Sequence, residues 1–155
     1  MFRYHRLSWA LIVFMLLSIA SCFSGNKDGT INLLSIAVKN SELINHDKLN
    51  KELLNITRKL QDTENLPLIF SMLWRTQNAQ HSVLSISKTN SEPQGVINVT
   101  LILDNIPDDD SVSGYRYDIK IKEVSDLVIE IIQAKKSWRC WEDRGHRNFG
   151  VSPCT

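Results

Sequence analysis

The sequence predicts an α+β domain in which one or two N-terminal helices pack on a four- to five-stranded antiparallel sheet, followed by a disulfide-stapled C-terminal tail. Three observations lead to this class. Apolar residues recur at helical spacing within residues 45–65, and they alternate with polar residues after Pro67. The segments between the alternating runs are short, which favours antiparallel neighbours. Two of the three cysteines, Cys140 and Cys154, lie close together in the sequence.

The predicted helix lies within residues 45–65. Four apolar side chains share one helical face because they follow one another at spacings of 4, 3 and 4: Leu49, Leu53, Ile56 and Leu60. Asn45 is predicted to cap this helix, and Asp47 in the first turn faces the positive end of its dipole. Pro67 is expected to end any helix that reaches it. Residues 31–38 are compatible with either a buried strand or the start of a helix.

Five apolar or alternating runs are predicted as strands: 68–74, 81–87, 96–103, 115–122 and 127–141. The run 115–122 alternates most regularly, which is typical of a half-buried strand. Its charged residues face one way and its apolar residues the other: Tyr115, Tyr117, Ile119 and Ile121. Residues 104–114 and 123–126 have the composition of turns.

The N-terminus has the format of a secretory signal. Arg3 and Arg6 precede an apolar run, and residues 1–21 end in small side chains just before Cys22. Residues 19–22, Ile-Ala-Ser-Cys, resemble the lipobox of bacterial lipoproteins. In that family the cysteine thiol receives a diacylglycerol, and the chain is cut immediately before the cysteine.

Carried over to this chain, the resemblance implies a lipidated Cys22 that anchors the protein in a bilayer. Residues 1–21 are then a signal peptide, 22–30 a lipidated tether and 31–155 a single α+β domain. Phe23 stands where an aspartate would indicate inner-membrane retention, so the resemblance favours the outer membrane, with the domain facing the periplasm. Two other interpretations remain open, namely the signal peptide of a secreted soluble protein and an uncleaved membrane anchor.

Charge and cysteine content narrow the functional classes. The chain carries 18 Lys and Arg against 17 Asp and Glu, which argues against a general nucleic-acid-binding protein. Cys140 and Cys154 are an even pair in an exported chain, and an oxidising compartment predicts a disulfide between them. The alternative, a pair of metal-binding thiolates, lacks further ligands at zinc-site spacing. We therefore expect neither a metal nor a cofactor.

The sequence after residue 135 concentrates cations and aromatic rings around the two cysteines. Trp and Arg are enriched at binding hot spots, and a crosslinked loop has already lost much of the entropy that binding removes. The candidate partner-binding residues are therefore Trp138, Trp141, Arg144, His146 and Arg147. The alternative is that the disulfide and the aromatic rings only fasten the tail onto the edge of the sheet.

The same region resembles the ending of small bacterial exported lipoproteins of unknown function. The resemblance rests on the order Trp138, Cys140, Arg144-Gly145-His146, Phe149 and Cys154. It covers the tail and, more loosely, the alternating strands from residue 96 on. It implies an envelope location and brings no known activity with it.

No catalytic residue is expected. His146 is the only histidine of the tail, and neither Ser137 nor Ser152 lies in a nucleophile-elbow motif. The aspartates at 108–110 lack the spacing of a calcium-binding loop. We expect a non-catalytic binding or accessory lipoprotein, such as an assembly factor, an inhibitor or an immunity-type protein, whose partner is another envelope protein or an incoming one. The alternative is a periplasmic hydrolase with an unrecognised site.

Overall fold

The computed structural model describes residues 32–88, 95–107, 110–125 and 128–155. The part of the chain from Asn32 to Thr155 forms one compact unit. The bounds of its elements, in chain order, are η2 Leu33–Ser35, β1 Glu42–Leu43, α2 Asp47–Leu60, α3 Leu66–Trp74, η3 Thr76–Asn78, β2 His81–Ser87, β3 Val96–Asp104, β4 Val112–Ser125 and β5 Val128–Cys140.

The predicted signal peptide (1–21), the lipidation site Cys22 and the tether (22–30) lie outside the described residues. None of the helices in the described part of the chain combines the length and the apolar character that crossing a membrane needs.

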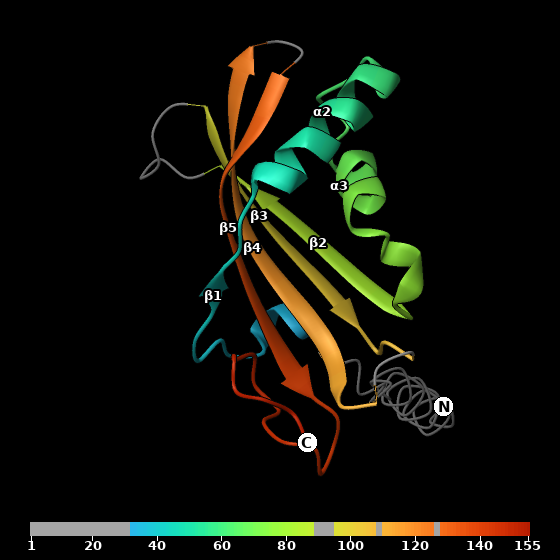
Figure 1. Ribbon diagram of the computed structural model, residues 1–155, viewed down its shortest axis with the longest axis vertical. Helices are drawn as coiled ribbons and strands as arrows, with labels where there is room; N and C mark the ends of the chain where they lie inside the picture. Colours follow the sequence, from blue (N-terminus) through green and yellow to red (C-terminus); the bar gives the residue numbers. More distant parts are fainter. Residues whose placement is uncertain (1–31, 89–94, 108–109, 126–127) are drawn as a thin grey trace, which may run out of the picture. The chain divides into compact units, whose positions relative to one another are not determined.

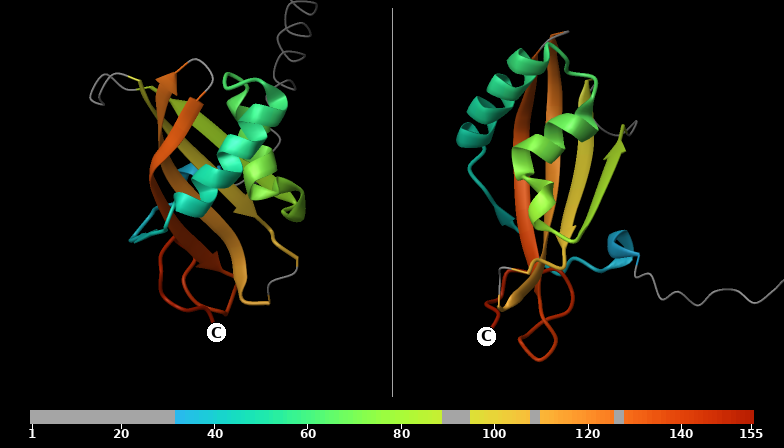
Figure 2. Two further views of the ribbon diagram at one scale, coloured as in Figure 1. Left: turned by 45° about the horizontal axis from the view of Figure 1, so that its top comes forward. Right: turned by 90° about the vertical axis from the view of Figure 1, so that its right-hand side faces the viewer.

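The five strands form a single antiparallel sheet in the order β1-β5-β4-β3-β2. The helices α2 and α3 lie on one face of this sheet (Figures 1 and 2). β2, β3, β4 and β5 are neighbours in chain order, as their short connections predict. The predicted fold class is therefore confirmed.

The predicted helix is α2, and its apolar stripe packs on the core. Two residues of the stripe are buried and two are partly buried: Leu53, Ile56, Leu49 and Leu60. Asn45 Oδ1 accepts a hydrogen bond from the N–H of Asp47 at 2.8 Å, while the N-cap position itself is occupied by His46. The helix ends at Leu60, and its C-cap residue, Gln61, has a left-handed φ of 52°.

Residues 68–74, predicted as a strand, belong to the helix α3 instead. Pro67 does not end a helix, contrary to the prediction, because it lies in the first turn of α3, where no N–H is required. The Asn65 side chain caps the helix by accepting from the N–H of Leu68 at 3.3 Å. The apolar residues also recur at helical spacing, and one such set is buried: Leu66, Ile69, Phe70 and Leu73.

Residues 31–38 were compatible with either a strand or a helix, and their described part, 32–38, forms neither. Leu33–Ser35 make one 3-10 turn, in which the Asn32 side chain accepts from the N–H of Leu34 at 3.2 Å. Val38 then makes an isolated parallel bridge with Phe149. The segment is therefore held by contacts with the tail, which local periodicity does not reveal.

The main core lies between the two helices and the sheet. β3, β4 and β5 contribute alternate side chains to it: Ile97, Val99, Ile119, Ile121, Ile129, Ile131 and Ala134. The predicted alternation of 115–122 is confirmed, because Ile119 and Ile121 are buried and Arg116 and Asp118 extend from the opposite face. On that opposite face Arg116 forms an ion pair with Asp118 at 2.9 Å.

The face of the sheet opposite the helices carries a second, smaller apolar cluster. Leu33 of η2 and Phe149 of the tail pack there on Ile102 of β3, with Ile36 and Val83 partly buried beside them. Segments from both ends of the described chain therefore meet on this face.

A buried ion pair joins β5 to β3 across β4. Arg139 Nε donates to Asp104 Oδ1 at 2.9 Å, and each of the two side chains is only 9% exposed. β4 passes between them at Gly114, where an added Cβ would lie 2.6 Å from the same carboxylate oxygen. Glycine is required here because displacing one partner would leave a buried charge without its counter-ion.

The outer edge of β5 is covered from the N-terminal side by β1 and α2. β1 pairs with β5, and the N–H of Ile44 donates to the carbonyl of Ala134 at 3.0 Å. Asn50 of α2 bonds twice to Ile131, because its Nδ2 donates to the carbonyl at 3.0 Å and its Oδ1 accepts from the N–H at 2.8 Å. The Asn50 side chain thus takes the place of a neighbouring strand at an edge that would otherwise attract another chain.

Replacing Asn50 with alanine should leave both main-chain groups of Ile131 without their protein partner. Asn55→Ala, at an exposed position of the same helix, gains the same helix propensity and is the matched control. We expect the free energy of unfolding, measured in urea, to be about 1–3 kcal/mol lower in Asn50→Ala than in Asn55→Ala. Equal stabilities of the two variants would contradict the edge-capping role.

Candidate functional site in the C-terminal tail

The C-terminal tail, defined here as residues 141–155, leaves the end of β5 and folds back along that strand (Figure 1, red). The N–H of Trp141 donates to the carbonyl of Ser111 at 2.9 Å, and the N–H of Arg144 closes a turn onto the carbonyl of Trp141 at 3.2 Å. The carbonyl of His146 then accepts from the N–H of Cys140 at 2.9 Å. The first half of the tail is therefore hydrogen-bonded to the strand that it leaves.

The second half of the tail fills the edge of the sheet. Gly150 exchanges two main-chain hydrogen bonds with Trp138 of β5, at 2.9 and 2.8 Å. The preceding tail residue, Phe149, bonds to the main chain of Ala37 and Lys39 at 3.0 and 2.8 Å. The tail thus covers the edge of β5, as one of the two interpretations of the sequence predicted.

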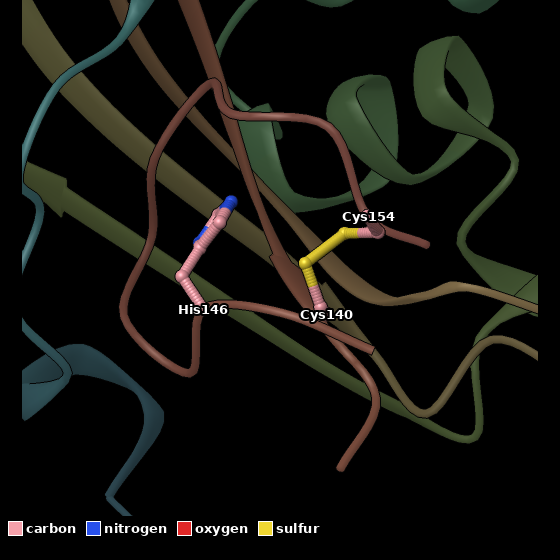
Figure 3. Close-up of side chains that lie close together, drawn as sticks. All are labelled: Cys140, His146 and Cys154. Carbon is pink, nitrogen blue, oxygen red and sulfur yellow. A yellow bond between two sulfur atoms is a disulfide. The ribbon is translucent and has the colours of Figure 1, made fainter. Parts of the chain in front are cut away.

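The predicted disulfide between Cys140 and Cys154 is confirmed, with Cα atoms 5.5 Å apart (Figure 3). The two cysteines are 14 residues apart in the sequence. Closing a loop of about this many residues stabilises a fold by roughly 3 kcal/mol in the chain-entropy model. Gly145 lies against the bond, since an added Cβ there would be 2.8 Å from Sγ of Cys140. Its φ of 142° also lies in the region that favours glycine, so both the space and the backbone explain this residue.

His146 is held inside the loop that the disulfide closes. Its Nδ1 lies 2.7 Å from the carbonyl oxygen of Asn148, and its Nε2 lies 2.9 Å from that of Ser152. Carbonyl oxygens only accept hydrogen bonds, so a ring nitrogen that carries a proton donates to the carbonyl that it faces. The imidazole therefore acts as a clasp between two main-chain carbonyls of the tail.

Cys140, His146 and Cys154 have possible ligand atoms within 4.8 Å of one another, the one such metal-like group among the residues described (Figure 3). The two sulfur atoms are bonded to each other, and the ring nitrogens face carbonyl oxygens. A zinc site needs thiolates and an unprotonated imidazole nitrogen. The observed arrangement therefore fits a structural crosslink better than a metal centre.

The structure brings together only some of the other predicted site residues. Trp138 Nε1 donates to the Ser152 carbonyl at 2.9 Å, so Trp138 and His146 share one acceptor. Arg147 bonds to a different acceptor, because its Nη1 donates to the carbonyl of Cys140 at 3.3 Å. Arg144 is exposed, and its carbonyl accepts from the N–H of Thr155 at 2.8 Å. Both arginines are exposed residues, and each guanidinium also donates to a main-chain carbonyl, since Arg144 Nη1 lies 3.4 Å from the carbonyl oxygen of Thr155.

An aromatic row that sequence reasoning missed extends from α3 along the helix-side face of β4. The ring of Trp74 lies 5.4 Å from that of Tyr117, which lies 6.4 Å from that of Tyr115. Lys136 Nζ follows at 4.2 Å from the Tyr115 ring centroid and 5.8 Å from that of Trp138. The alternation of residues 115–122 correctly placed the two tyrosines on one face. Trp74 was assigned to a predicted strand, 68–74, so its contact with Tyr117 from the helix α3 could not be foreseen.

Within this row, Tyr117 is partly buried and packs against the main core. Burial, with a smaller contribution from the charge of Tyr115, raises the pKa of Tyr117 to about 12. The row therefore begins at Trp74, which packs against the main core, and ends at the lysine and tryptophan next to the tail.

A pocket of about 700 Å³ lies elsewhere, between the α2–α3 connection and the ends of the strands. Its apolar lining includes Leu66 and Ile97, and its titratable residues are Glu64, Lys88 and Glu123. Lys88 forms an exposed ion pair with Glu123 at 3.2 Å. None of the predicted site residues lines this pocket.

Tyr117 makes stability sensitive to alkaline pH. Because its pKa is about 12 in the folded protein and 10.0 ordinarily, the folded state holds the phenolic proton more tightly. This stabilisation is complete below about pH 10 and is lost as the pH rises toward 12. We expect the free energy of unfolding to fall less steeply over this range in Tyr117→Phe than in the wild type, as measured by urea denaturation at several pH values. If the free energy of unfolding fell equally steeply with pH in Tyr117→Phe and in the wild type, the raised pKa of Tyr117 would be contradicted.

Four of the tail residues on which the expected resemblance to exported lipoproteins rests contribute to the crosslink or to the second apolar cluster. Cys140 and Cys154 form the disulfide, Gly145 gives it room, and Phe149 is fully buried on the second apolar cluster. Comparison of the whole chain with known proteins gives no match: no protein-family model fits it, and neither a curated protein nor a solved structure is significantly similar to it.

Proposed function

We propose that this chain is a bacterial envelope lipoprotein that acts as a non-catalytic binding or accessory protein at a membrane surface. The membrane attachment rests on the basic, apolar and small-residue pattern of residues 1–21 and on the lipobox-like sequence that ends at Cys22. The partner is another envelope protein or an incoming one, and the role is that of an assembly factor, an inhibitor or an immunity-type protein. Phe23 favours the outer membrane.

The observation that supports a binding role is the rigid presentation of the two tail arginines. The disulfide, the His146 clasp and the bonds of Gly150 to β5 fix the main chain of the tail. Arg144 and Arg147 are nevertheless exposed. A pre-ordered loop binds with a smaller entropic cost, and arginine is enriched at binding hot spots. The arrangement suits an acidic patch on a partner protein.

Hydrolysis is less well supported. Nucleophilic catalysis needs a serine hydroxyl within hydrogen-bond reach of a base. Ser137 of β5 is fully buried, and the ring nitrogens of His146 face main-chain carbonyl oxygens. Among the described residues of the tail, no serine hydroxyl is bonded to the histidine.

The membrane anchor is tested by the intact mass of the protein extracted from its native membrane. We expect a chain that begins at Cys22 and carries acyl groups, and an unprocessed chain when Cys22 is replaced by alanine. Fractionation of inner and outer membranes then locates the acylated form. A wild-type chain without acyl groups, cut at another position, would contradict the lipoprotein assignment.

The binding surface is tested by capture of partner proteins from solubilised envelopes. Arg144→Ala combined with Arg147→Ala should lower the yield of specific partners about tenfold or more, because hot-spot truncation costs more than 1 kcal/mol per residue. Lys51→Ala combined with Arg58→Ala removes two exposed cations from α2 and is the matched control. Unchanged capture by the tail variant, with its thermal stability intact, would show that the tail is only a fastener.

A further inference from the structure

The two outer edges of the sheet differ in whether other segments of the described chain cover them. Along β5 the outer edge is covered by β1, by Asn50 and by Gly150 of the tail. β2 is the edge strand on the other side. Within the described ranges, no segment pairs with its outer edge. An uncovered edge presents a row of N–H and C=O groups that match those of another strand.

The register of the sheet identifies the outward groups of β2. The N–H of Asn105 bonds to Ser113 of β4 and that of Glu123 bonds to Gly95, so odd-numbered residues of β3 bond to β4. Even-numbered residues of β3 therefore bond to odd-numbered residues of β2, as in the pairing of Ile102 with Val83. The remaining main-chain groups of β2 point away from the sheet, and they belong to Ser82, Leu84 and Ile86.

β2 also lacks the features that normally prevent strands from pairing edge to edge. Its sequence, His-Ser-Val-Leu-Ser-Ile-Ser, contains no proline, lysine or acidic residue. Its pairing with β3 runs without a bulge from His81 to Ser87. Leu84 and Ile86 project from the same face, and Ile86 is 38% exposed.

We propose that two copies of this chain associate by antiparallel pairing of their β2 edges, which makes one sheet continuous across both copies. The strand is complementary to itself in one register, in which Leu84 lies opposite Ile86 of the second copy and Ser85 lies opposite Ser85. This register forms two apolar pairs on the helix-side face, one on each side of the two-fold axis.

Charge supports a second copy as the occupant of this edge. The nearest cation, Lys88, falls opposite Ser82 of the second copy in the same register, so the pairing brings no like charges together. Two short strands bury less than the roughly 1,200–2,000 Å² typical of stable interfaces. The dimer is therefore weak and forms reversibly as the concentration rises.

Cysteine crosslinking tests both the pairing and its register. Ser85 bonds through its main chain to β3, so across the two-fold axis it forms a pair without hydrogen bonds, with Cα atoms about 4.5 Å apart. A disulfide spans that distance. Ser87 lies opposite Val83, so two copies of residue 87 are about 13 Å apart along the strands, which is beyond the reach of a disulfide.

We expect Ser85→Cys in the full chain, oxidised with copper phenanthroline in air, to give at least ten times more disulfide-linked dimer than Ser87→Cys. The wild type measures the background from the native cysteines, and thermal unfolding checks that each variant is folded. Adding Ile86→Lys to Ser85→Cys should reduce the yield to the level of Ser87→Cys. Equal yields from the two cysteine variants, or crosslinks from Ser85→Cys only to a different protein, would overturn the proposal.

Sedimentation of the wild-type chain in detergent provides a second readout that needs no substitution. Its mean mass should rise from monomer toward dimer over a hundredfold increase in protein concentration, and Ile86→Lys should stay monomeric. A wild type that stays monomeric throughout would overturn the proposal.

Discussion

The N–H and C=O groups along an open sheet edge need partners, and the outer edge of β5 obtains them from segments that are far apart in the sequence. β1 and the Asn50 side chain come from the N-terminal side of the domain, and Gly150 comes from the tail. β5 is also joined to β3 by the buried pair of Arg139 and Asp104. Segments from both ends of the described domain therefore contact β5, and the fixed conformation of the tail depends on its contacts with this strand.

This convergence reconciles the two interpretations of the tail. Fastening uses main-chain bonds at Gly150, the buried ring of Phe149, the His146 clasp and the disulfide. Recognition would use the guanidinium groups of Arg144 and Arg147, whose residues remain exposed. A tail that is held by its main chain is free to present such side chains in a fixed position, which is the condition for binding at low entropic cost.

Those elements that bury one face could be predicted from the sequence, because burial imposes a period. The leucine stripe of α2 and the alternation of β4 have that origin, and the paired cysteines predicted the disulfide. The run from 68 to 74 could not be assigned by period, since its apolar residues satisfy both a strand and a buried helix. The Asn65 cap and the position of Pro67 in the first turn decide between them.

Long-range contacts were beyond the reach of local pattern. Asn50 bonds to a main chain 81 residues further on, and nothing around it in the sequence marks it as an edge cap. The row from Trp74 to Lys136 depends on the correct placement of α3 over β4. Of the candidate site, the sequence predicted the crosslink and its residues, while the hydrogen bonds of His146 and of Trp138 of β5 to the tail required the structure.

The outer edge of β5 is covered by separate segments, and the disulfide holds one of them. Amide hydrogen exchange, measured by NMR on the wild type and on a Cys140→Ser, Cys154→Ser variant, tests it most directly. We predict that the amides of Trp138 and Gly150 lose protection in the variant, while the Ile131 amide, which Asn50 covers, keeps it. Unchanged protection of Trp138 and Gly150, or equal loss at all three amides, would contradict the account.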